Sequence, residues 1–158
     1  MEALRGCVTS ITEAIEEVAD EEREAGSPEE RTIEVSKELS SDLLAFITSL
    51  ETSAKKDMIV GTRKISTTLT NLVDAANGMS AKNKDRGNQE KIISAAVKAR
   101  KTGVNLKILT AMAAAGTDAG KETTQNMERI ENAVEELCES VVKLIELTNV
   151  GQLEWVTV

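Results

Sequence analysis

The closest approach to a catalytic motif lies in residues 108–123, which read I-L-T-A-M-A-A-A-G-T-D-A-G-K-E-T. An apolar run leading into Gly120-Lys121 has the outline of a loop that binds nucleotide phosphates. That chemistry needs a glycine where Ala115 stands, and a Ser or Thr to hold magnesium where Glu122 stands. The Glu122 carboxylate would also repel phosphate. We therefore interpret the stretch as a helix end, a turn and a new helix start, and expect no nucleotide site.

Other residues that commonly perform catalysis are scarce. The chain has no His and no Tyr, which removes the commonest general base and several metal ligands. Its two cysteines, Cys7 and Cys138, occupy apolar positions of helical patterns, as buried thiols do. Adjacent acids such as Glu135-Glu136 fall on the polar side of a helix, whereas catalytic carboxylates need a cleft that perturbs their pKa. We expect no enzyme, no metal and no cofactor.

The composition predicts an all-α fold. Apolar residues make up 41% of the 158 residues, but aromatic residues only 1%, and there is a single proline. Sheets draw on aromatic and β-branched residues, whereas this chain is rich in the Ala, Leu, Glu and Lys that favour helices. We predict an up-and-down antiparallel bundle of five helices, or of four plus one, over residues 1–150. Residues 151–158 are predicted to form an extended tail.

The helices are separated by short turn signals, so consecutive helices should be antiparallel neighbours. The clearest boundary is residues 26–28, where a glycine that suits a helix end precedes a serine cap and a proline suited to the first helical position. Glu30 would complete a capping box. The predicted helices cover about residues 2–24, 28–56, 57–77, 88–116 and 117–148.

Two of these boundaries depend on weaker signals. Lys55-Lys56 suits a helix C-terminus, and Asp57 could cap the third helix. Asn77-Gly78 and the polar residues 82–88 predict a break before the fourth helix. Small residues in the fourth helix, among them Gly103, would let a neighbouring helix approach closely.

Charge is segregated along the chain. Residues 1–30 carry ten acids and two bases, and residues 118–154 carry nine acids and three bases. Residues 55–107 carry twelve bases and four acids, in a chain whose net charge is −8. This middle portion is either a solvated helix surface or a docking surface for an anionic partner, such as an actin filament or a peripheral contact with anionic lipid. Nucleic acid is not expected, because no aromatic residue lies near the bases to stack on them.

The most regular pattern is an apolar line along residues 130–148, with acids on the other side. A helix of this kind buries one face against other helices. The order of large and small apolar residues resembles the vinculin-binding helices of talin. The corresponding residues are Ile130, Ala133, Val134, Leu137, Cys138, Val141, Leu144, Ile145 and Thr148.

The resemblance extends over about residues 32–148. The sequences of residues 65–77 and 89–96 look like successive helices of the talin rod, near its actin-binding I/LWEQ module. The resemblance implies a bundle of the vinculin/talin superfamily that links adhesion or membrane machinery to actin in the cytoplasm. Because the Trp-Glu-Gln signature of that module is missing, two alternatives stay open. One is a scaffold like focal-adhesion-targeting bundles, which bind amphipathic peptide helices, and the other is a structural spacer.

Two surfaces are candidate partner sites. The first is the apolar line of residues 130–148, buried at rest and exposed if the bundle opens, which would serve vinculin-like helical proteins. Buried hydroxyls at Thr62 and Thr110 would lower stability and ease that opening. The second is a basic stripe against acidic actin. The basic stripe comprises Lys55, Lys56, Arg63, Lys64, Lys98, Arg100, Lys101 and Lys107.

The last residues form a separate candidate. Thr157 and Val158 have the shape that a PDZ domain accepts by adding a strand, provided that Val158 is a free terminus. A linker, or Trp155 folding back on the bundle, explains the same residues. No leader and no membrane-spanning run is recognised in the sequence, so we expect a cytoplasmic location.

Overall fold

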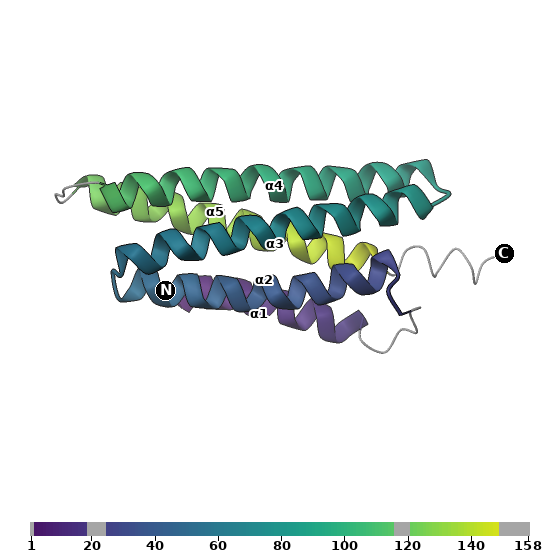
Figure 1. Ribbon diagram of the computed structural model, residues 1–158, viewed down its shortest axis with the longest axis horizontal. Coiled ribbons are helices and arrows are strands. Elements are labelled where there is room, and N and C mark those ends of the chain that lie inside the picture. Colours follow the sequence, from purple (N-terminus) through teal and green to yellow (C-terminus); the bar gives the residue numbers. More distant parts are fainter. Residues whose placement is uncertain (1, 19–24, 116–120, 149–158) are drawn as a thin grey trace.

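The computed structural model describes residues 2–18, 25–115 and 121–148, and five helices account for nearly all of them. They run side by side and alternate in direction (Figure 1). The predicted all-α bundle is thereby confirmed, and the described ranges contain no strand. The helices are α1 (Glu2–Val18), α2 (Pro28–Glu51), α3 (Lys55–Lys82), α4 (Arg86–Ala115) and α5 (Lys121–Leu147).

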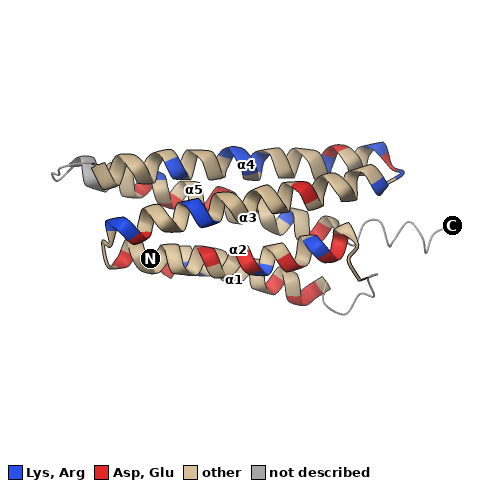
Figure 2. Cartoon of the chain, in the orientation of Figure 1, with Lys and Arg blue, Asp and Glu red and all other residues tan. Residues whose placement is uncertain are grey.

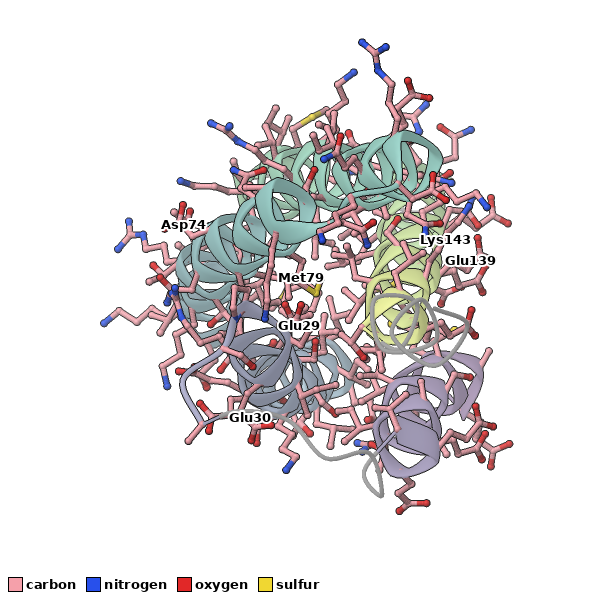
Figure 3. All side chains as sticks on the ribbon, turned by 90° about the vertical axis from the view of Figure 1, so that its right-hand side faces the viewer. Glu29, Glu30, Asp74, Met79, Glu139 and Lys143 are labelled. Atoms are coloured by element: carbon pink, nitrogen blue, oxygen red, sulfur yellow. The ribbon has the colours of Figure 1, made fainter. Side chains whose placement is uncertain are left out.

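The five helices form a closed ring around one core. Each helix packs against the next along the chain, and α1 packs against α5 to close the ring, as the end-on view in Figure 3 shows. Every helix contributes large side chains that are almost completely buried, including Leu4, Phe46, Leu72, Leu106 and Leu137. α1 is the shortest helix, and it covers α2 and α5. No helix in the described part of the chain is long and apolar enough to cross a membrane.

The boundary between α1 and α2 follows the sequence signals. Gly26 has a φ of +79°, a left-handed conformation that glycine adopts without a steric penalty. The Ser27 side chain accepts a hydrogen bond from the backbone N–H of Glu30 at 3.2 Å, and Pro28 occupies the first helical turn. The predicted serine cap and helical proline are confirmed. The first helix is described as far as Val18, so its predicted extension to residue 24 lies outside the described residues.

The predicted boundary between α2 and α3 is wrong. α2 ends before Ser53, which has a φ of +54°, and Lys55-Lys56 begins α3 instead of ending α2. Ala54 occupies the cap position without a side-chain hydrogen bond, and Asp57 lies within the first turn. The chain reverses here because the backbone N–H groups of Ser53 and Ala54 bond back to carbonyls of the last α2 turn. These local hydrogen bonds determine the end of α2, although lysine residues favour a helix C-terminus.

The predicted break at Asn77-Gly78 is also wrong, because α3 continues through it to Lys82. A Cβ at Gly78 would lie 3.1 Å from the ring of Pro28, so the bare glycine lets the start of α2 pack against α3. Burial of Met79 in the same turn offsets the cost of about 1 kcal/mol that a glycine carries inside a helix. The break comes at residues 83–85, within the polar stretch 82–88 that was also predicted to interrupt the helices.

α4 begins two residues earlier than expected. Asp85 Oδ1 accepts hydrogen bonds from the backbone N–H groups of Gly87, at 2.8 Å, and Asn88, at 3.4 Å. This is the arrangement of an aspartate N-cap, and it fixes the start of α4 at Arg86. Further along, a Cβ added to Gly103 would lie only 2.3 Å from Leu69 Cδ1. The small residue therefore allows α3 and α4 to pack closely, as its type predicted, and sets their register.

Candidate functional site

The apolar line of α5 lies entirely inside the bundle. All nine residues that resemble a vinculin-binding helix are buried, each at most 2% exposed. α5 packs against α1 and α4 along its sides and touches α2 across the core. In this closed form no partner can reach the line. The nine residues are Ile130, Ala133, Val134, Leu137, Cys138, Val141, Leu144, Ile145 and Thr148.

The two cysteines lie where α1 meets α5. Both are free thiols, Cys138 buried and Cys7 partly buried against the core. Burial is the largest cause that raises the pKa of the Cys138 thiol to about 12, and Cys7 and the carboxylates Glu135 and Glu139 contribute the rest. Burial also raises the pKa of Cys7, with the same two carboxylates adding to the effect. Both side chains are therefore protonated packing groups at neutral pH and not nucleophiles.

The two threonines singled out from the sequence differ in their hydrogen bonding. Both are buried, Thr62 at 3% and Thr110 at 0% exposure. The Thr62 hydroxyl donates to the carbonyl of Ile59 at 2.9 Å, within its own helix. The Thr110 hydroxyl has no partner, and neither has the buried hydroxyl of Ser36 on α2. An unpaired buried hydroxyl lowers stability, so Thr110 and Ser36 are the positions where polar groups weaken the core.

All members of the basic stripe are exposed on two adjacent helices. Because α3 and α4 are antiparallel and Leu69 lies against Gly103, Arg63 of α3 is at about the same height along the bundle as Lys107 of α4. Consecutive residues on a helix point about 100° apart, so neighbours such as Lys101 and its preceding arginine diverge. The eight cations are therefore spread over the outer sides of α3 and α4 instead of forming a single line, and we call these eight residues the basic face. Figure 2 shows Lys and Arg spread over α3 and α4.

α4 also carries an exposed apolar line that was not predicted from the sequence. Five large aliphatic side chains on its outer side are between 44% and 54% exposed. We call this set the outer ridge. The sequence contains a pattern that could have predicted these residues, because a second apolar line runs along α4 opposite the line that faces the core. The residues of the outer ridge are Ile93, Val97, Val104, Ile108 and Met112.

The cations of α4 border the outer ridge on both sides. Arg100 and Lys107 are three residues before and four after Gly103, so they share its side of the helix, toward α3. Lys98 lies on the other side of the ridge, and Lys101 lies within the ridge, seven residues before Ile108 and almost in line with it. No acid occurs in residues 91–115, and within the described ranges no acid forms an ion pair with these cations. The surface therefore combines exposed apolar area with cations that form no ion pair among the described residues.

Comparisons with known proteins assign no family. No protein-family model matches the chain, and a search of curated proteins finds no match. Over the described residues there is also no group of three or more Cys, Asp or Glu side chains arranged to hold a metal ion. Thr157, Val158 and Trp155 lie outside the described residues, as do residues 116–120 of the rejected phosphate loop. The candidate surfaces therefore have to be judged on their own chemistry.

Proposed function

We propose that this chain is a non-enzymatic adaptor or scaffold domain, which binds an acidic partner through the exposed basic face of α3 and α4. The observation that carries the proposal is the outer side of α4, where residues 91–115 contain no acid and cations without an ion pair in the described residues lie beside exposed aliphatic side chains. A domain held together only by its own core has no need for such a surface, because a solvated helix normally carries mixed charges on its outer side.

The charge distribution supports an acidic partner. The chain as a whole carries a net charge of −8, so the basic face is a local exception that would orient an approaching anionic surface. The resemblance of residues 32–148 to the talin rod makes the actin filament, which is acidic, the first partner to test. In this proposal the domain works in the cytoplasm and links adhesion or membrane machinery to the cytoskeleton.

Co-sedimentation with filamentous actin at low and at moderate salt tests the proposal. The variant Lys98→Glu/Arg100→Glu/Lys101→Glu removes three cations of the basic face. The matched control, Lys37→Glu/Arg129→Glu/Lys143→Glu, makes the same change in net charge at exposed positions of α2 and α5. We expect pelleting that weakens with salt, is lost in the first variant and is kept in the control. Equal pelleting of the two variants would count against the basic face.

A second candidate function rests on α5. Its buried line resembles a vinculin-binding helix, and α1 and α4 cover it from its two sides. The unpaired hydroxyls of Ser36 and Thr110 lower the free energy needed to open the core. In this function a vinculin-like head domain captures α5 after opening. Binding of vinculin head should then be weaker for Thr110→Val than for the wild type, since that variant stabilises the closed bundle.

A further inference from the structure

The outer ridge is more than a scatter of exposed apolar residues. Single exposed aliphatic side chains are normal on a protein surface, whereas aligned ones form a continuous apolar area. All five ridge residues belong to one helix, and each is about half exposed. α4 therefore has apolar residues on two opposite sides, one in the core and one in solvent. The second side contributes nothing to the core and exposes apolar area to water at a cost in free energy.

The ridge is a band along one side of α4, in which Ile93 and Met112 lie about 100° apart around the helix. Ile93 and Val104 are eleven residues apart, and so are Val97 and Ile108. Eleven residues complete three helical turns almost without remainder, so this spacing gives a line that runs along the helix axis. Ile93, Val97, Val104 and Ile108 fall within about 60° of one another, over a length of about 22 Å at about 1.5 Å per residue. A second helix could lie against these four residues. The β-branched side chains of the ridge lose little rotamer freedom on contact.

The charges beside the ridge restrict what can bind it. Arg100 and Lys107 border it toward α3, Lys98 borders it on the other side, and Lys101 lies within it. Glu90, which precedes the ridge, is the only acid among the residues of α4. A helix that packed on the ridge would bring its own flanking residues beside these cations. Acids at those positions would form favourable pairs across the contact, whereas bases would be repelled.

We propose that the outer ridge is the docking site for an amphipathic α-helix of a partner protein, with an aliphatic line and acidic residues on both edges. This inference rests on the proposed function and names the partner element for the same face of α4. A bilayer surface fits the structure less well. Helices that lie in a membrane interface commonly carry Trp, Phe or Leu on the apolar side, and the ridge has none of these residues.

A synthetic helical peptide tests the docking site. The probe is a blocked 20-residue peptide with one line of Leu, Glu on both flanks and Ala elsewhere. Its control peptide has Lys in place of every Glu. Fluorescence anisotropy should show saturable binding of the Glu peptide that weakens with salt, and no binding of the Lys peptide. Absence of saturable binding by the Glu peptide, or equal binding by the two peptides, would overturn the proposal.

Variants locate the binding on the protein. Val104→Gln/Ile108→Gln removes the apolar contact at the ridge without changing net charge, and should weaken binding by more than about tenfold. Leu44→Gln/Val60→Gln is the matched control, because these aliphatic side chains are also exposed but lie on α2 and α3. The control should bind as the wild type does. Circular dichroism should show equal helix content in all variants, since every changed side chain faces solvent. A ridge variant that binds like the wild type would refute the docking site.

Two further outcomes separate this inference from the function on which it rests. If the Glu peptide fails to bind but actin still pellets with the domain, the docking site is wrong and the adaptor function stands. If neither binds, both are wrong. Vesicles of phosphatidylserine and phosphatidylcholine provide the third arm. Vesicle binding that is lost in Val104→Gln/Ile108→Gln, without peptide binding, would replace the helix partner by a lipid surface.

Discussion

Thr110→Val should stabilise the bundle, although it removes a polar group from a helix. The Thr110 side chain is 0% exposed and its hydroxyl has no hydrogen-bond partner. Valine has nearly the same shape, with a methyl group in place of the hydroxyl. The substitution therefore removes an unsatisfied group from the core without creating a cavity.

The size of the effect follows from two contributions. A buried hydroxyl without a partner costs about 1–3 kcal/mol. The added methyl group contributes about 0.8 kcal/mol when it is fully buried. Part of the first contribution is lost if the hydroxyl rotates toward a backbone carbonyl in some molecules. We therefore expect a gain of about 1–2 kcal/mol in the free energy of unfolding, equivalent to a rise of roughly 2–8 °C in Tm for a domain of this size.

Thr62→Val is the matched control. Thr62 is also buried, but its hydroxyl donates to the Ile59 carbonyl at 2.9 Å. The lost hydrogen bond, worth about 1 kcal/mol, and the gained methyl contact nearly cancel, so the stability should change by less than about 0.5 kcal/mol. Urea unfolding followed by circular dichroism at equal m-values measures both variants.

A Thr110→Val variant no more stable than the wild type would refute the reasoning. It would mean that the hydroxyl is satisfied in solution, either by the carbonyl one turn earlier or by a water molecule. The same result would also weaken the proposal that unpaired hydroxyls ease the release of α5. Equal gains in Thr110→Val and Thr62→Val would instead show that the methyl group alone is responsible.

Three other predictions concern packing and thiol chemistry. Gly103→Ala should be about 1–3 kcal/mol less stable than Gly6→Ala in urea unfolding. Both variants gain helix propensity, but the new methyl group contacts Leu69 at position 103 and meets open space at position 6. Iodoacetamide at pH 8 should modify Cys138 only on unfolding, since its thiol is buried with a pKa of about 12, while partly buried Cys7 reacts slowly. Above about pH 8.5 the Cys138 thiol loses its proton in the unfolded chain but keeps it in the folded protein. The free energy of unfolding should therefore fall as the pH rises toward 12, and it should fall more steeply than in Cys138→Ala. Urea unfolding at a series of pH values measures this difference.

The fold was predictable because its signals are local and repeated. An apolar line such as that of residues 130–148 fixes which side of a helix is buried, whatever it packs against. The helix boundary at Ser27 and Pro28 could also be predicted from the sequence, because capping depends only on the neighbouring backbone. The errors arose where distant contacts decided the outcome. Gly78 stays helical because Pro28 packs against it, and no residue near Gly78 in the sequence indicates that contact.

The candidate site was likewise predictable in part: the residue types could be identified from the sequence, but their arrangement could not. Residue types identified the cations of the third and fourth helices, but their division over the two sides of the ridge depends on which side of α4 faces α3. Likewise, Thr62 and Thr110 are alike in the sequence and differ only in whether the folded core leaves the hydroxyl a partner.

The sequence by itself determined that this chain folds as helices with buried apolar lines and segregated charge, because periodicity and composition act within each segment. The tertiary structure alone decided which apolar line is covered and which is left in solvent. α5 lies between α1 and α4 and its line is closed off, whereas α4 has neighbours only on its inner sides, and its second line remains exposed. A helix can display two apolar lines in its sequence, but only the positions of its neighbours determine which one is available to a partner.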